Sequence, residues 1–182
     1  MLGIDLAGAP GRSTGVCIYR GAKELTTLVL HTDEELHRLV RSTQPALVVV
    51  DAPLSLPRGR DSLQERNGVH FRACDRELRR LGIRFFPLTL GPMRMLTERG
   101  MRLAREWREE GLRVVEGYPG GSQDLLGLPR KQQGTRELQA ALRARGLGGP
   151  VRTQELTHDE LDAVTIAWVG DMFLRGRGQE IG

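Results

Sequence analysis

The sequence predicts an α/β fold with a mixed five-stranded sheet, made of a three-stranded antiparallel meander plus two parallel strands and flanked by helices. Three observations support this. Short strand-like segments joined by tight turns fill the first 30 residues. The continuous apolar run Ala46–Val50 is typical of a strand covered on both faces. Segments with helical periodicity then surround a last strand. The length of 182 residues suits a single domain, which we expect to span 1–182.

The meander is predicted at the start of the chain. Leu2 and Ile4 alternate with small or acidic residues, so the first strand has one apolar face. The glycine-rich turn GAPGRSTG leads into a second strand over Val16–Tyr19. A third strand fits Glu24–Leu30 after another short turn. Connections this short are those of antiparallel neighbours.

Helices are predicted on either side of the remaining strands. Asp33–Ser42 has apolar residues at helical spacing. A helical insertion is expected at about 52–111, with one helix ending at Gly82 and another starting at Pro92. The chain then returns to strand over Leu112–Tyr118.

Two further helices are predicted near the end of the chain. One is outlined by apolar residues between Leu138 and Arg145. The last begins at Thr157, because Thr157 and Glu160 have the spacing of a capping box, and it runs to about Leu174.

The charge of the chain is unevenly distributed. The formal net charge is +4, and 25 of the 27 basic residues are arginine. Residues 58–113 contain 14 arginines and 8 acidic residues. A basic segment on a slightly acidic body fits a phosphate-rich partner, although a solvated helical surface has the same composition.

Other features of the sequence restrict its location. No stretch of about 18 apolar residues is present, so we expect no membrane span. The N-terminus has the pattern of a first strand and not that of a targeting segment, so we expect a cytoplasmic protein. Cys17 and Cys74 provide no disulfide framework and no metal-binding spacing, and both are expected to be buried.

Acidic residues occur where apolar packing is expected. Asp5 lies in the first strand, Asp51 directly follows the apolar strand, and Glu116 lies in the last strand. Asp159 and Asp162 begin a helix that is otherwise almost entirely apolar. Burying an unpaired carboxylate is costly, so each of these residues needs a strong partner. A divalent cation shared by several of them would meet that need.

The expected topology favours such a site. Ligand sites in these sheets form beyond the carboxyl ends of the parallel strands, where Asp51 stands. Asp159 and Asp162 are three residues apart and share one face of their helix. An all-oxygen set of ligands suits Mg²⁺ or Mn²⁺, and two ions about 4 Å apart would stabilise both the attacking and the leaving oxygen of a cleaved phosphodiester.

Each acid also has a structural alternative. The helix dipole favours Asp159 and Glu160 in a first helical turn. Asp51 before Ala-Pro is also typical of a turn. Glu116 is a candidate for pairing with one of the many arginines. Asp5 and Asp162 are the hardest to explain in this way.

The segments GIDLAG, VVVDAPLSLP, RACDRELRRLG, VVEGYPG and HDELDAVTIAW together resemble a family of predicted ribonuclease H-fold nucleases catalogued as a domain of unknown function. The wider similarity is to Holliday-junction resolvases. It implies a ribonuclease H-like fold and two Mg²⁺ or Mn²⁺ ions held by Asp5, Asp51, Asp159 and Asp162, and it marks Glu116 as a further catalytic candidate. Those resolvases generally have glutamate where this chain has Asp51. They work as dimers, so the resemblance also implies a homodimer.

The family pattern marks further residues of the chain. Lys131 is one of two lysines, and we interpret it either as a phosphate contact or transition-state stabiliser, or as a surface lysine at a helix start. Arg72, with Arg76 and Arg79 on following turns, is a candidate for tracking a nucleic-acid backbone, and Asp75 is a substrate-binding candidate beside them. Arg72 and Asp75 have a second interpretation, a hydrogen bond to each other across one helical turn.

These observations favour a metal-dependent nuclease that hydrolyses phosphodiester bonds of DNA or RNA. The first alternative is a nucleic-acid-binding protein without catalysis, which rests on the arginine-rich insertion. The second is a nucleotide-dependent phosphotransferase of the actin and sugar-kinase kind, in which a turn such as GAPGRSTG holds phosphates. The chain has no second D-x-G hairpin, which such enzymes need, so this alternative ranks low.

Overall fold

The structure is a computed structural model that describes residues 1–181, apart from the side chain of Lys131. Its sheet has the strand order β3-β2-β1-β4-β5. The pairs β1–β2 and β2–β3 are antiparallel, whereas β1–β4 and β4–β5 are parallel. This confirms the predicted mixed sheet. The strands are β1 (Leu2–Asp5), β2 (Thr14–Gly21), β3 (Glu24–Leu30), β4 (Val48–Val50) and β5 (Val114–Glu116).

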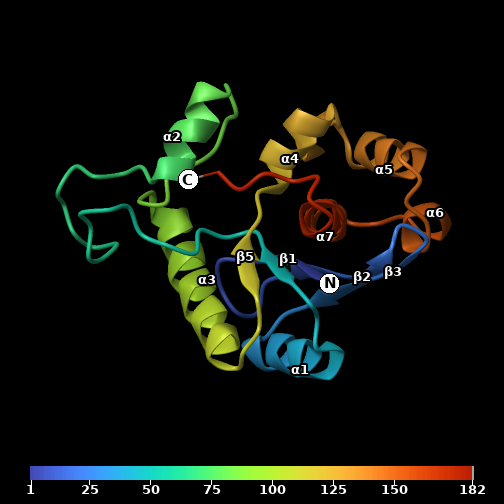
Figure 1. Cartoon of the computed structure of the whole chain (residues 1–182), viewed down its shortest axis with the longest axis horizontal. Helices are drawn as coiled ribbons and strands as arrows, with labels where there is room; N and C mark the ends of the chain where they lie inside the picture. Colours follow the sequence, from blue (N-terminus) through green and yellow to red (C-terminus); the bar gives the residue numbers. More distant parts are fainter. Residues whose placement is uncertain (182) are drawn as a thin grey trace.

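Helices pack against both faces of the sheet (Figure 1). On one face, α1 and α3 bury Leu36 and Trp107 against Ile4 and Val50. On the other, α7 packs along β1 and β2, and α5 packs beside α7. The helices are α1 (Asp33–Thr43), α2 (Ala73–Arg80), α3 (Gly91–Glu109), α4 (Pro119–Leu126), α5 (Thr135–Ala144), α6 (Pro150–Thr153) and α7 (His158–Leu174), with a 3₁₀ turn, η1 (Lys131–Gln133).

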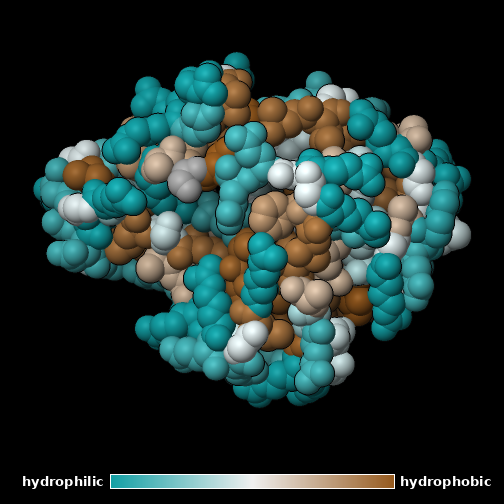
Figure 2. All heavy atoms as spheres, in the orientation of Figure 1, coloured by the Kyte–Doolittle hydropathy of each residue, from teal (hydrophilic) through white to brown (hydrophobic). Residues whose placement is uncertain are grey.

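The segment between β4 and β5 is only partly an insertion. Parallel neighbours require a crossover connection, and α3 provides it, with Leu103 and Trp107 fully buried in the core. The predicted boundaries of 52–111 therefore include a helix that belongs to the frame formed by the sheet and the helices on its two faces. Residues 52–80, a long loop followed by α2, lie outside that frame, and we call them the arm. Figure 1 shows the arm at the left edge of the molecule, and its outer surface in Figure 2 is mostly hydrophilic.

The helix α4 has no counterpart among the elements expected from the sequence. Gly120 and Gly121 in its first turn are poor helix formers, and the strand that precedes it stops at Glu116. The helix forms because it packs against α7. Among the described residues, no helix is both long and apolar enough to cross a membrane.

Candidate functional site

Asp5 and Asp51 lie at the ends of two neighbouring strands. The parallel register pairs Ile4 with Val50, and the Asp51 amide donates a hydrogen bond of 2.8 Å to the Ile4 carbonyl. Continuing this register by one residue places Asp5 opposite Asp51. Side chains alternate along a strand, so both carboxylates belong to the sheet face opposite the one that buries Ile4 and Val50. That is the face covered by α7.

Two glycines let α7 come close to the sheet at this point. A Cβ atom at Gly15, the register partner of Asp5, would lie 2.1 Å from the Asp159 carbonyl oxygen. A Cβ atom at Gly3 would lie 2.2 Å from the Ala163 carbonyl oxygen. Only glycine permits such contacts, so helix backbone rests directly on strand backbone. The first turns of α7 are thereby brought to the strand end that carries Asp5.

Asp162 faces inward from this part of α7. Its side chain is buried, and its Oδ1 accepts a hydrogen bond of 2.7 Å from Nε2 of Gln123, which is also buried. Gln123 lies on α4, the helix that the sequence does not predict. Gln123 has no signal in the sequence, because its role depends on the packing of α4 against α7.

Asp159 occupies the first turn of α7. Thr157 and Glu160 form the predicted capping box, with hydrogen bonds in both directions. The Asp159 carboxylate is partly exposed and lies 2.7 Å from Nδ1 of His158. The structural role predicted for Glu160 is therefore confirmed, while Asp159 stands one helical turn before Asp162 at the same end of the helix.

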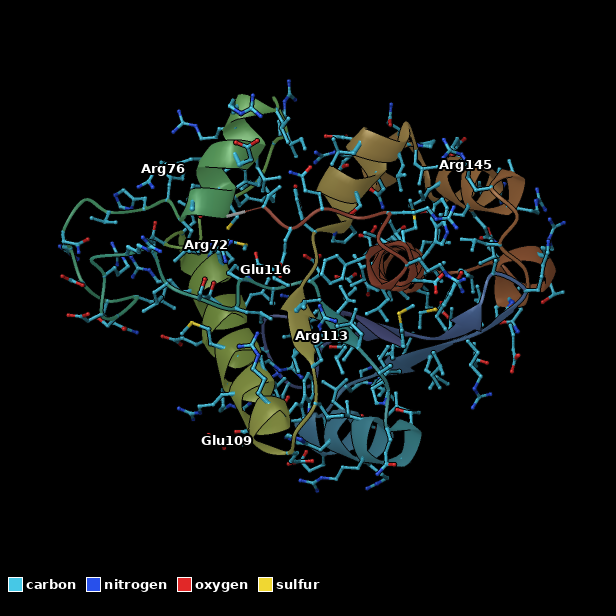
Figure 3. The ribbon with its side chains drawn as sticks, viewed as in Figure 1. Arg72, Arg76, Glu109, Arg113, Glu116 and Arg145 are labelled. Atoms are coloured by element: carbon cyan, nitrogen blue, oxygen red, sulfur yellow. The ribbon has the colours of Figure 1, made fainter. Side chains whose placement is uncertain are left out.

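Glu116 faces the other side of the sheet. Its register partner is Val50, whose side chain belongs to the α1–α3 core, and its carboxylate accepts hydrogen bonds of 2.6 and 2.8 Å from Arg72 (Figure 3). A third bond comes from the Leu54 amide. The structure therefore brings Glu116 together with Arg72 and not with Asp5, in agreement with the arginine-pair alternative.

Arg72 and Asp75 are both buried, and they hydrogen-bond to each other as well. Arg72 is the N-cap residue of α2 and not part of its polar side. Because its guanidinium is directed to Asp75 and Glu116, the expectation that Arg72 and Asp75 contact substrate is not supported. Arg76 and Arg79 are exposed on α2, so they remain candidates for contacting a nucleic-acid backbone. The predicted contact of Lys131 with phosphate concerns a side chain that lies outside the described part of the structure.

Tyr118 follows β5, caps the start of α4 and contacts the segment after α2. Its hydroxyl donates a hydrogen bond to the Arg84 carbonyl, and the Arg130 guanidinium lies over its ring, 5.8 Å from the centroid. Burial raises the pKa of Tyr118, and the negative charge of Asp51 adds to this, whereas Arg130 opposes it. The Tyr118 hydroxyl therefore stays neutral at physiological pH and lies within electrostatic range of Asp51.

The arrangement at the sheet edge limits how a metal ion can bind. Among the described residues, no group of three or more His, Cys, Asp or Glu side chains lies close enough to hold an ion. The expected cluster of several carboxylates is therefore not found in the part of the chain that the structure describes. Mg²⁺ usually keeps several waters and is held by one or two carboxylates together with substrate phosphates. Neighbouring carboxylates such as Asp5 and Asp51 fit that mode of binding, and their oxygen donors suit Mg²⁺ or Mn²⁺.

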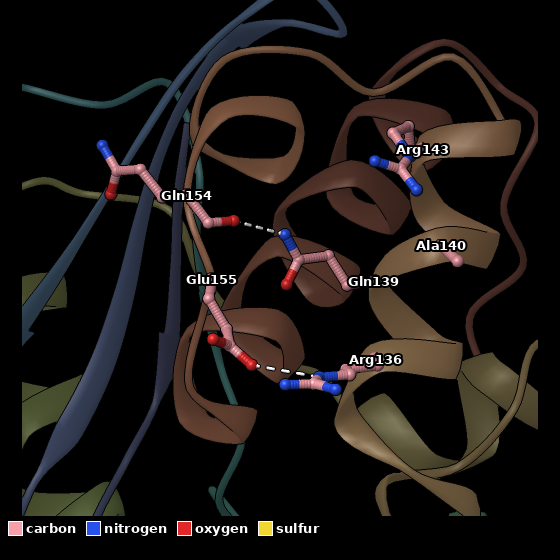
Figure 4. A pocket seen from close by; sticks show the side chains of 6 residues that line it. All are labelled: Arg136, Gln139, Ala140, Arg143, Gln154 and Glu155. Carbon is pink, nitrogen blue, oxygen red and sulfur yellow. Dashed lines mark hydrogen bonds and ion pairs between the residues drawn. The ribbon is translucent and has the colours of Figure 1, made fainter.

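Two surface hollows lie away from these carboxylates. One, of about 300 Å³, lies between α5 and the segment before α7, where Arg136 bonds Glu155 and Gln139 bonds the Gln154 carbonyl (Figure 4). The other, of about 390 Å³, lies beside the glycine-rich turn and is lined in part by Arg99. Arg99 donates a hydrogen bond of 2.6 Å to the Ala7 carbonyl and pairs with Asp33, so it supports the turn from inside.

Comparisons with known proteins agree with this fold. No curated protein matches the chain significantly. The solved structure of T. thermophilus RuvC in complex with a Holliday junction substrate is similar over 100% of this chain and 99% of its own, with a TM-score of 0.51 and 17% sequence identity. This similarity confirms a ribonuclease H-like fold. The sequence profile described as "Protein of unknown function (DUF429)" matches residues 3–182, so the chain belongs to the DUF429 family.

Proposed function

We propose that this protein is a metal-dependent nuclease that hydrolyses phosphodiester bonds of nucleic acid. One observation carries the proposal: Asp5 ends β1 and Asp51 directly follows the adjacent strand β4, on the sheet face against which the first turns of α7 pack. The fold adds support, because RuvC, which shares it, is seen in complex with a Holliday junction substrate. The family description itself assigns no activity.

The roles follow from position. Asp5 and Asp51 bind the divalent cations, Mg²⁺ or Mn²⁺, and two ions are expected. Asp162, oriented by Gln123, and Asp159 complete the ligand set from α7. Bound divalent ions supply a Lewis acid and stabilise charge on the phosphoryl oxygens. No side chain in this set needs to form a covalent intermediate.

The test compares the wild-type chain with Asp5→Asn and Asp162→Asn in assays with Mn²⁺, Mg²⁺ or a chelator. Each substitution keeps the shape of the side chain and removes its charge. We expect both variants to lose cleavage of labelled DNA and RNA substrates and to lose the rise in melting temperature caused by Mn²⁺. Asp171→Asn is the matched control, because Asp171 pairs with Arg175 at the opposite end of α7.

Retention of metal-dependent cleavage by Asp5→Asn would refute the assignment. The same experiment distinguishes the nuclease from the main alternative, nucleic-acid binding without catalysis. That alternative is favoured by the absence of a preformed three-ligand group among the described residues. That alternative predicts salt-sensitive binding that survives loss of Asp5, with no product in any metal. The homodimer remains a prediction, to be checked by light scattering with and without nucleic acid.

A further inference from the structure

We propose that the arm, residues 52–80, is a prefolded clamp for the phosphate backbone of the nucleic acid, which it contacts through Arg58, Arg66, Arg76 and Arg79. The inference rests on the proposed function, since it assigns the substrate-binding surface of the same site. It concerns binding and not cleavage, so the two can fail separately.

The arm is attached to the edge of the sheet at two points. It begins directly after Asp51, at the end of β4. It returns to the sheet at Arg72, whose guanidinium donates two hydrogen bonds to Glu116, the last residue of β5. The arm therefore starts beside Asp51 and is anchored at the end of the neighbouring strand β5, so a nucleic acid bound along it lies at this edge of the sheet.

An internal arginine fixes the shape of the loop. Arg60 is 5% exposed, although it lies in a surface loop. Its guanidinium donates to the carbonyls of Val69 and Glu65 at 2.7 Å each, and to those of Ser62 and Leu63 at 3.0 and 3.3 Å. One side chain thus cross-links the loop from residue 62 to residue 69. A loop held in this way loses little conformational freedom when it binds a ligand.

The arginines of the arm divide into two groups. The arm contains seven arginines and four acidic residues. Arg60 and Arg72 are buried and used internally, and Arg80 pairs with Glu77. The remaining four are exposed, and within the described part of the chain no carboxylate lies within ion-pair distance of them. They are Arg58, Arg66, Arg76 and Arg79.

Two of these arginines are arranged on a helix. Arg76 and Arg79 are three residues apart on α2 and therefore share a face. The Arg79 guanidinium lies 4.9 Å from the centroid of the Phe71 ring, which restricts its motion and leaves its N–H groups at the surface. Exposed guanidinium groups match phosphate oxygens in charge and in geometry. Binding of this kind reads the backbone and carries no base sequence information.

The experiment measures binding of a fluorescent duplex DNA to the full chain by anisotropy, in chelator and over a series of salt concentrations. We expect Arg58→Gln/Arg66→Gln and Arg76→Gln/Arg79→Gln each to weaken binding about tenfold at low salt. Each pair should also flatten the slope of log K against log salt by roughly 0.9 for every phosphate group that is no longer neutralised. The matched control is Arg38→Gln/Arg143→Gln, two exposed arginines on α1 and α5, which should leave the slope unchanged.

A second variant tests the cross-link separately from the exposed charges. Arg60→Met keeps the four exposed arginines and removes the internal hydrogen bonds, so affinity should fall more than in the single variant Arg38→Gln, which removes the same charge. Equal slopes for the arm variants and the control would overturn the inference, as would tighter binding of poly-glutamate than of DNA. If the arm variants weaken binding but the wild type cleaves nothing in any metal, only the proposed nuclease activity is contradicted. If the wild type cleaves but the arm variants bind normally, only the proposed role of the arm is contradicted.

Discussion

The Arg72 guanidinium holds Glu116 across 44 residues of sequence, donating hydrogen bonds of 2.6 and 2.8 Å to its two carboxylate oxygens. Burial lowers the pKa of Arg72, but its hydrogen bonds to Glu116 and Asp75 outweigh burial, so the pKa is raised. Arg72→Met leaves two carboxylates without their cation, one of them buried, and should lower the free energy of unfolding by about 3 kcal/mol. Urea denaturation measures the decrease, and limited proteolysis should show the first cuts within the arm.

A matched substitution separates the ion pair from general packing. Arg76→Met removes an exposed arginine from the same helix and should change stability by less than about 0.5 kcal/mol. Similar urea midpoints for Arg72→Met and the wild type would contradict the anchoring role of Arg72.

We predict that Asp33 makes a pH-dependent contribution to the stability of the fold. Burial raises its pKa, but hydrogen bonds from Arg99 and Arg102 outweigh burial, so the pKa lies below its ordinary value. A lowered folded-state pKa means that the stabilisation is complete above the unfolded-state value and is lost as pH falls through the folded-state value. Asp33→Asn should therefore cost about 2 kcal/mol at neutral pH and progressively less below about pH 4. Melting curves of both proteins over this range measure the difference; one that stays constant with pH would contradict the prediction.

Gly15→Ala tests the contact between α7 and the sheet. The added Cβ would lie 2.1 Å from the Asp159 carbonyl oxygen, so helix and strand backbones must separate. We expect a decrease of several kcal/mol in the free energy of unfolding, together with loss of the melting-temperature rise caused by Mn²⁺. Gly21→Ala is the control, since nothing lies within 4 Å of a Cβ at that position. Equal stability of the two variants would show that the contact is easily relaxed.

Gln123→Leu removes the donor to Asp162 while keeping similar volume. Loss of a buried hydrogen bond to a charged group should cost about 2 kcal/mol, and a less restrained Asp162 should raise the Mn²⁺ concentration needed for thermal stabilisation. Gln64→Leu, at an exposed position of the arm, should change neither quantity. An unchanged Mn²⁺ requirement in Gln123→Leu would remove Gln123 from the site.

The two thiols should differ in reactivity. Burial raises the pKa of Cys17 to about 12, although the nearby N-terminal ammonium opposes this. Burial also raises the pKa of Cys74, which is only half-buried, contrary to the expectation that both would be buried. Iodoacetamide at mildly alkaline pH should label Cys74 slowly and Cys17 only after unfolding, as mass spectrometry can show. Labelling of Cys17 at the rate of Cys74 in the folded chain would contradict this.

Local signals predicted much of the fold. The third strand has the predicted bounds Glu24–Leu30, and the capping box at Thr157 starts α7 as expected. Both depend on neighbours within a few residues, as periodicity and capping do. The β4 strand is shorter than the predicted run Ala46–Val50, because it starts only at Val48, where pairing with β5 begins.

Features that depend on distant contacts were not predictable. The helix α4 has a poor intrinsic propensity and forms against α7, so neither it nor the Gln123–Asp162 bond has a sequence signature. For Glu116 the sequence allowed two partners, a cation or an arginine, and only the strand register shows which face it occupies. The identity of Arg72 as that arginine required the fold of the arm.

The close packing of α7 on Gly3 and Gly15 restricts which parts of the carboxylate region can change among related chains. Peptide atoms, which are common to all residues, set the separation of helix and strands there, so exchanging neighbouring side chains does little to adjust it. The reach of the acidic side chains is then the main variable that evolution can alter. Exchanging aspartate for glutamate at position 5, 51 or 162 moves a carboxylate by one methylene group against a fixed frame. Under the proposed function, this is the expected route by which related chains would acquire a different ion spacing.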